Sequence, residues 1–176
     1  MEPDSCSTEE YLFDNKSFLI NWQTIDQLVD LISSYLGLSN FETSVSFVSD
    51  KEIKDLNSEY RNKDKETDVL SFPLNEWTTL PSVEYPHKIT VNDGIPQALG
   101  DIIISPNTAL YNANKIGQGL DREVCFLLVH SILHLCGYDH MESIEEKKMI
   151  EQQQKIMKLL ENESPDIWAA CVEVKS

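Results

Sequence analysis

The strongest constraint on the fold is an apolar segment between residues 121 and 136. Its apolar residues recur at helical spacing, but they cover most of the helix circumference: Val124, Leu127, Leu128, Ile132 and Leu135. A helix that is apolar on most of its surface is stable only when it is buried. Gly137 provides a typical helix end, so the sequence predicts a buried helix surrounded by the rest of the chain.

The remaining elements follow from hydrophobic periodicity and turn residues. Strands are predicted near residues 18–20, 43–48, 67–72 and 99–105, and further helices near residues 24–36, 49–60, 106–116 and 143–161. Thr24 is the predicted cap of the first of these helices, with Gln27 as its capping-box partner. Ser49 and Glu52 have the same spacing at the start of the next helix. Residues 74–97 lack clear periodicity, so we expect an irregular surface segment there, a candidate lid.

The chain has 176 residues, which is enough for one domain with a sizeable core. Residues 1–16 are polar and acidic, and we expect them to be a flexible N-terminus. Residues 17–162 are the predicted folded domain, and residues 163–176 are a tail whose structure the sequence does not predict. The continuous apolar run near residues 99–105 suits a central strand of the sheet.

The charge balance is strongly acidic. Lys and Arg number 14 and Asp and Glu number 30, so the formal net charge is −16. Such a surface aids solubility and repels anions at long range, and it does not favour general nucleic-acid binding, which depends on phosphate neutralisation by Lys and Arg. An RNA substrate would therefore require a local concentration of basic residues.

The sequence carries no sign of export or of a membrane anchor. It begins without a basic and then apolar leader, no stretch approaches the length of a membrane span, and its four cysteines form no CxxC pair. We therefore expect a cytoplasmic protein without membrane contact.

Three of the four histidines fall within one short segment. His130 and His134 are four residues apart, so on a helix they project from one face as neighbours. Gly137 lets the chain turn, and His140 returns as a third ligand. Zinc accepts three nitrogen ligands and keeps a fourth position for water, so the spacing predicts one catalytic Zn²⁺ per chain. A single buried histidine is more often a hydrogen-bonded core residue, but three in this pattern favour a metal site.

Two neighbours of these histidines bear on the kind of site. Zinc peptidases place Glu directly after the first histidine as general base, and here that residue is Ser131. This weakens the interpretation as a zinc peptidase. Cys136 could supply a fourth ligand of a structural zinc site, but it lies two residues after His134, off the face that carries the histidines.

The stretch from His130 to His140 resembles the signature of the YbeY family of endoribonucleases, also called rRNA maturation factors. Two other stretches match the same family, in the same order: LNSEYRNKDKETDVLSFP at residues 56–73 and LGDIIIS at residues 99–105. The resemblance spans about residues 17–160. Ser131 is a departure, because the family usually has Gly there, but the change removes no ligand.

The resemblance implies a single-domain α+β fold with a small mixed, mostly parallel sheet, flanking helices and a zinc site at one edge. It implies that residues 17–162 form a YbeY-like metal-dependent hydrolase domain. It further implies a zinc-dependent, single-strand-specific endoribonuclease acting in rRNA maturation and ribosome quality control. The implied partners are single-stranded RNA, rRNA, and the small ribosomal subunit with its proteins; the oligomeric state stays open.

The resemblance also assigns a functional arginine, Arg61. A guanidinium stays charged and can bind a phosphate in a bidentate way, so beside a zinc-bound water, as nucleophile or base, it could hold the scissile phosphate. Lys63 and Lys65 are either further phosphate contacts or solvated loop charges. Asp139 is either an acceptor for a ligand N–H or a turn cap.

A non-catalytic alternative stays open at this point. Zinc could simply hold the last two helices together in a ribosome-assembly factor, which the acidic charge and the missing Glu would suit. A zinc peptidase is the third interpretation.

Overall fold

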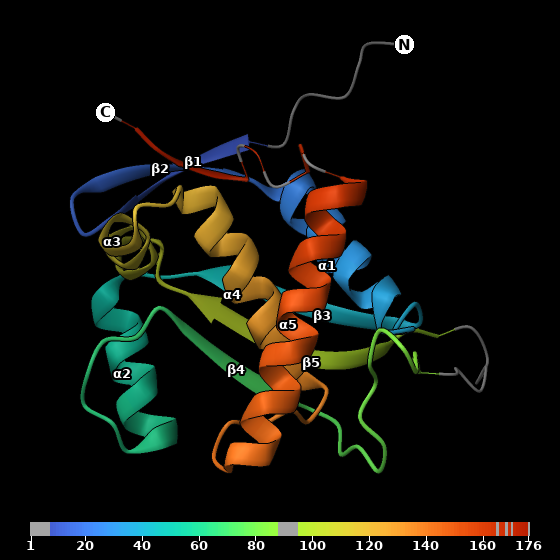
Figure 1. The fold of residues 1–176 in the computed structure, drawn as a ribbon. Helices are drawn as coiled ribbons and strands as arrows, with labels where there is room; N and C mark the ends of the chain where they lie inside the picture. The colour runs from blue at the N-terminus through green and yellow to red at the C-terminus, as the bar shows by residue number, and fades with distance from the viewer. Residues whose placement is uncertain (1–7, 88–94, 165, 168, 170, 176) are drawn as a thin grey trace.

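The computed structural model describes residues 8–87, 95–164, 166, 167, 169 and 171–175. Its elements follow in this order (Figure 1): β1 Thr8–Phe13, β2 Lys16–Asn21, α1 Trp22–Tyr35, β3 Phe41–Phe47, α2 Asp50–Arg61, β4 Val69–Pro73, β5 Gln97–Ile104, α3 Pro106–Ile116, α4 Leu120–Leu135, α5 Ser143–Glu163 and β6 Val172–Val174. The predicted strands correspond to β2–β5 and the predicted helices to α1–α5. Strands β1 and β6 were not predicted.

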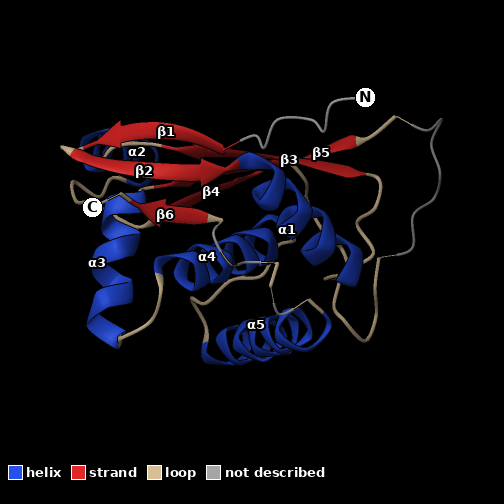
Figure 2. Cartoon of the chain, turned by 90° about the horizontal axis from the view of Figure 1, so that it is seen from above, coloured by secondary structure: helices blue, strands red, loops and turns tan. Residues whose placement is uncertain are grey.

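Helix α4 lies at the centre of the fold, as its apolar surface requires. Eleven of its 16 residues are buried, and it contacts α1, α3 and α5 as well as β4, β5 and β6. Figure 2 shows the strands on one side, α4 beneath them, and α5 on the far side of α4. The predicted burial of this helix is confirmed, because it packs against strands as well as against other helices.

The sheet that faces α4 has the strand order β3-β5-β4. Strands β3 and β5 are parallel, but β4 pairs with β5 in the antiparallel direction, so the prediction of a mostly parallel sheet is wrong. Strand β5 is central in this sheet, and Leu99, Ile102 and Ile104 of its apolar run are buried while Ile103 is half-buried. Continuous apolar sequence reports burial and carries no information on the direction of the neighbouring strand.

Side chains alternate across this sheet, and each face has its own helix. On one face, Ile102 and Ile104 of β5 belong to the core that includes α4. On the other face, Phe72 of β4 packs against Tyr60 of α2, with ring centroids 5.2 Å apart. The alternation directs Ser71 of β4 toward α4, because strand neighbours point to opposite faces.

A second sheet has the order β1-β2-β6, and all its pairings are antiparallel. Strand β1 lies within residues 1–16, so the expectation of a flexible segment is wrong for residues 8–13; residues 1–7 lie outside the described residues. Strand β6 gives the tail a structure, since Val172 pairs with Ile20. The sequence missed β6 because it has only three residues, and it missed β1 because that strand is mostly exposed and begins with polar residues.

Asp50 ties the start of α2 to the start of α3. Its carboxylate accepts hydrogen bonds from the side chains of Ser105, Asn107 and Thr108. Burial raises the pKa of Asp50, but the bonds from Ser105, Thr108 and Asn107 together outweigh it, so the pKa lies below its ordinary value.

The segment after β4 is irregular, as expected, over its described residues 74–87. It is anchored to the end of α4: the Trp77 indole donates to the carbonyl of Leu135 at 2.9 Å, and the Tyr138 hydroxyl donates to the carbonyl of Pro81 at 2.8 Å. The rest of the candidate lid, residues 88–94, lies outside the described residues. Among the described helices, none is both long and apolar enough to cross a membrane.

Candidate active site

The three histidines come together at the C-terminal end of α4. His130 and His134 lie one helical turn apart, and their Nε2 atoms are 3.1 Å from each other. His140 follows in the loop after α4, with its ring centroid 5.1 Å from that of His134 and 6.0 Å from that of His130. Gly137 turns the chain between them at φ +89°, a conformation that favours glycine. The structure thus gathers the three rings that the spacing brings to one place.

Hydrogen bonds at the Nδ1 atoms determine where the two helix histidines carry their protons. His134 Nδ1 donates to the carbonyl oxygen of Tyr138 at 2.8 Å, and His130 Nδ1 lies 3.0 Å from Oε1 of Gln153. A carbonyl or amide oxygen only accepts, so both protons are on Nδ1 and both Nε2 atoms present lone pairs. This arrangement, with the outer nitrogen bonded to an acceptor, is the one that metal-binding histidines adopt.

The histidines offer imidazole nitrogens, which are suitable donors for a metal ion, but the three rings do not form a complete coordination site. Within residues 8–87, 95–164 and the described part of the tail, no group of three or more His, Cys, Asp or Glu side chains is arranged closely enough to hold a metal ion. His140 is the member that stands apart, since its side chain is 53% exposed. The converging Nε2 pair with a third imidazole nearby nevertheless has the chemistry of a zinc site.

Burial lowers the pKa of both helix histidines. For His134, burial is the main cause, His130 adds to it, and the pKa falls to about 4. For His130, burial again lowers the pKa. Both rings are therefore neutral near pH 7, which is the form that ligates metals.

Basic side chains line a cavity of about 250 Å³ that opens on all three histidines. Arg61 is the last residue of α2, and its Nη2 donates to the carbonyl oxygen of Ser71 on β4 at 3.2 Å. Lys63 and Lys65, in the loop after α2, line the same cavity. The structure therefore brings all three predicted basic residues to the histidines; we call this space the basic cavity.

Further polar residues line the basic cavity and were not identified from the sequence, among them Asn57 and Asp68. Asn57 is buried, and its side-chain amide donates to the carbonyl of Lys65 at 2.8 Å, which holds the loop in place. Asp68 lines the cavity and accepts a hydrogen bond from Asn112 at 3.0 Å. Both belong to the stretch that resembles the YbeY family, and that stretch was the available signal.

Asp139 contacts His140, as one of its two proposed roles requires. Its Oδ1 accepts a hydrogen bond from the backbone N–H of His140 at 2.7 Å and lies 3.4 Å from the ring Nδ1. The shorter bond is to the backbone, so turn capping is the stronger of the two contacts.

Ser131 and Cys136, the residues relevant to a peptidase site and to a structural zinc site, are both buried in the core. Ser131 has no exposed surface, and its Oγ has no hydrogen-bond partner among the described residues. It therefore cannot act on water at the histidines as a peptidase base would. Cys136 is also wholly buried, and burial raises the pKa of its thiol to about 12, which speaks against a fourth zinc ligand.

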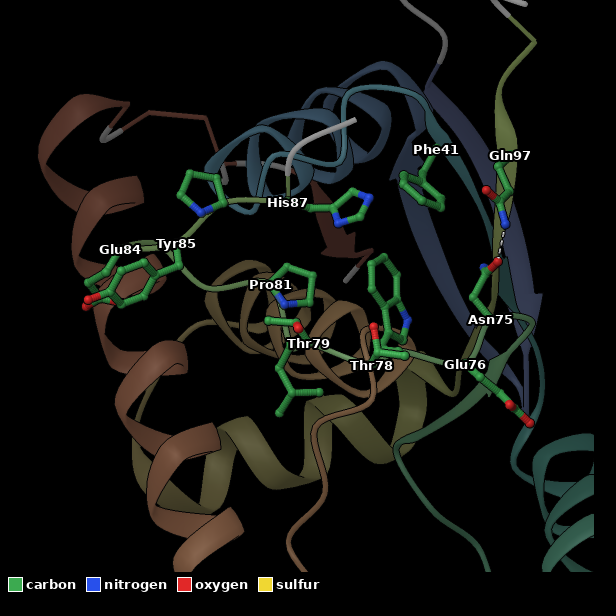
Figure 3. A pocket seen from close by; sticks show the side chains of 13 residues that line it. Phe41, Asn75, Glu76, Thr78, Thr79, Pro81, Glu84, Tyr85, His87 and Gln97 are labelled. Atoms are coloured by element: carbon green, nitrogen blue, oxygen red, sulfur yellow. Dashed lines mark hydrogen bonds between the residues drawn. The ribbon is translucent and has the colours of Figure 1, made fainter. Parts of the chain in front are cut away.

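A larger cavity lies elsewhere, against the irregular segment (Figure 3). It has a volume of about 700 Å³, and His87, Phe41 and Trp77 contribute to its wall. The ring of His87 lies 5.9 Å from that of Phe41 and 5.2 Å from that of Trp77. His87 is thus part of an aromatic cluster and takes no part in the histidine site.

Comparison with known proteins gives a consistent family. The model of the family Endoribonuclease YbeY matches residues 13–161. Among curated proteins, Endoribonuclease YbeY of Halalkalibacterium halodurans is 47% identical over 122 residues, covering 69% of this chain and 74% of that protein. Endoribonuclease YbeY of Caldicellulosiruptor bescii is 43% identical over 132 residues, covering 75% of this chain and 81% of that protein.

A solved structure agrees with the fold. The solution structure of a protein from Thermotoga maritima is 28% identical and superposes with a TM-score of 0.56, covering 82% of this chain and 86% of that one. The family match, the relatives and the gathered histidines lead to one conclusion: this chain belongs to the YbeY family.

Proposed function

We propose that this protein is a zinc-dependent endoribonuclease that cleaves single-stranded RNA in rRNA maturation. The observation that carries the proposal is the basic cavity, in which three cationic side chains and three histidines face one space. Relatives named Endoribonuclease YbeY support the type of reaction.

The proposed resident ion is one Zn²⁺ per chain, held by His130, His134 and His140. When bound, zinc supplies Lewis acidity and lowers the pKa of a coordinated water to about 7. The protein contributes orientation, because the bonds to Tyr138 and Gln153 keep the Nδ1 protons away from the ion side.

Arg61 is the proposed clamp for the scissile phosphate. Its bond to the Ser71 carbonyl fixes the guanidinium at the cavity wall, and its further N–H donors match the oxygens of a phosphate. Charge that develops on the phosphate during cleavage would be stabilised there. Lys63 and Lys65 raise the local positive potential beside it.

This arrangement accounts for RNA binding by a protein of net charge −16. Exposed charges act over about 8–10 Å at physiological salt, so the acidic surface elsewhere does not cancel three cations gathered in one cavity. The acidic surface instead disfavours RNA binding outside the site. We place the activity in the cytoplasm, in ribosome quality control as well as rRNA maturation, with the small ribosomal subunit and its proteins as partners.

Cleavage of a labelled single-stranded RNA by zinc-loaded protein tests the proposal. Wild type should cleave it, whereas His134→Ala and Arg61→Ala should not. His87→Ala is the matched control, since His87 lies outside the site. Equal cleavage by wild type and His134→Ala would overturn the proposal. A zinc-containing wild type that binds the small subunit without cleaving RNA would favour the non-catalytic assembly factor.

A further inference from the structure

A second cavity is lined by two of the same histidines, His130 and His140. It has a volume of about 260 Å³ and lies between α4, α5 and the start of β4. His130, His140, Asp68 and Val69 line both this space and the basic cavity. The two cavities are therefore continuous with one site, and we call the second one the apolar cavity.

The walls of the apolar cavity differ in chemistry from those of the basic cavity. Besides the two histidines it is lined by Phe126 and Leu127 of α4 and by Met149 and Ile150 of α5, which give it an apolar wall. None of its described lining residues is Lys or Arg, whereas two carboxylates, Asp68 and Glu146, line it. A phosphate is therefore a poor occupant, because it would meet apolar walls and carboxylates with no Lys or Arg to offset them.

Phe126 presents a flat aromatic surface beside the histidines. Its ring is nearly parallel to that of His130, with an interplanar angle of 16° and centroids 6.2 Å apart. Aromatic side chains of this kind are the usual stacking partners of unpaired RNA bases. The Gln153 amide in the same wall can hydrogen-bond to the edge of a base.

We propose that the apolar cavity binds the base of the nucleotide next to the scissile phosphate, an inference that rests on the proposed function. An RNA strand carries a charged phosphate and an aromatic base on each nucleotide, and the site has one cavity suited to each, with His130 and His140 lining both. A base can enter this cavity only when it is unpaired. The cavity thus gives the enzyme a physical reason to prefer single strands, since a duplex keeps its bases stacked and paired.

Exposed isoleucines on α5 offer a matched pair of variants. Ile150 lines the cavity and is 45% exposed, whereas Ile144 is 68% exposed and does not line it. Ile150→Ala should damage base binding, and Ile144→Ala should not. Phe126→Leu is a second cavity variant that keeps an apolar side chain in place of the stacking surface.

The experiment uses a short single-stranded RNA in which one base at a time is removed, leaving the sugar and phosphate. Binding to zinc-loaded protein is followed by fluorescence anisotropy, and cleavage is followed on the same strands. At one position, loss of the base should weaken binding to wild type and to Ile144→Ala by roughly fivefold or more. In Ile150→Ala and Phe126→Leu the same loss should weaken binding clearly less, because the altered cavity no longer stabilises the bound base.

The inference is overturned if no position shows the effect, or if the effect is equally large in both cavity variants. Its failure is distinguishable from failure of the proposed function. Cleavage by wild type without any base effect contradicts the apolar cavity alone. A base effect on binding that depends on Ile150, in a wild type that never cleaves RNA, supports the cavity and contradicts the nuclease activity.

Discussion

His130 and His134 present their Nε2 atoms to each other at 3.1 Å, although each ring carries its proton on the opposite nitrogen. Two lone pairs in this position repel, and a shared cation removes the repulsion. This relationship makes a bound metal the central expectation for the site.

Zinc should stabilise the folded protein. At a free concentration about 100 times its dissociation constant, a ligand adds about 2.7 kcal/mol, which corresponds to roughly 5–10 °C in melting temperature for a chain of this size. Thermal unfolding with zinc and with a chelator measures the shift. His87→Ala should keep the shift and His134→Ala should lose it; a shift of the same size in both variants would speak for zinc binding elsewhere.

Gln153 should act through His130. Gln153→Ala removes the acceptor of the His130 Nδ1 proton, and loss of such a partner typically lowers metal affinity about 10- to 100-fold. Competition with a fluorescent zinc chelator measures the affinity. Gln154→Ala, at the neighbouring exposed residue, should leave it unchanged. If Gln153→Ala binds zinc as tightly as wild type, the assigned proton position has no role in binding.

Arg61 should contribute to cleavage and leave zinc binding intact. Removal of one group that stabilises charge in a transition state costs about 10²–10³-fold in kcat, and we expect a loss of that order for Arg61→Ala. Arg61→Lys should recover part of it, because Lys keeps the charge but lacks the planar fork. Single-turnover cleavage with parallel zinc analysis measures both effects. Arg61→Ala with the full wild-type rate would exclude the clamp role.

Ser131→Ala should make the metal-free protein more stable. A buried hydroxyl without a partner costs about 1–3 kcal/mol, and alanine removes it with a gain in helix propensity. Urea unfolding in the presence of a chelator measures the change. Ser105→Ala is the control, because Ser105 is equally buried but bonded to Asp50, and it should lower the stability. A destabilised Ser131→Ala would mean that the hydroxyl has a partner in solution.

Asp50 should make the stability depend on acidity. Its pKa in the fold lies below the ordinary value, so its contribution is complete above the ordinary pKa of about 3.9 and is lost as the pH falls through the lower folded value. Asp50→Asn should therefore be less stable than wild type at pH 7, by about 1–3 kcal/mol, and the difference should shrink toward pH 3. Urea unfolding at both pH values checks this. A difference in stability that is the same at both pH values would contradict a lowered pKa of Asp50 in the fold.

The start of a helix was predicted correctly from the sequence where no other nearby side chain could cap it. Ser49 and Glu52 form the predicted capping box of α2. At α1, Thr24 was the predicted cap, but the side chain of Asn21 accepts from the Thr24 N–H, and the helix starts at Trp22. Asn21 is both the last residue of β2 and the cap of α1. A pattern that considers the helix alone does not include a cap that lies in the preceding strand.

Strand pairing and the site could be predicted only in part. The direction of β4 depends on how the whole chain returns to β5, and β1 and β6 pair with β2 from opposite ends of the sequence. The i,i+4 spacing of His130 and His134 is a local helix property and could be predicted. The meeting of Arg61 with these histidines is a tertiary contact, and only the family resemblance pointed to it. The apolar cavity, between α4 and α5, had no signal in the sequence.

The role of zinc in RNA cleavage is tested most directly by measuring zinc content and single-stranded RNA cleavage on the same preparations of wild type and His130→Ala. Wild type should contain about one zinc per chain and cleave the RNA, and His130→Ala should lose both. Cleavage that persists in a zinc-free His130→Ala protein would contradict this role of zinc.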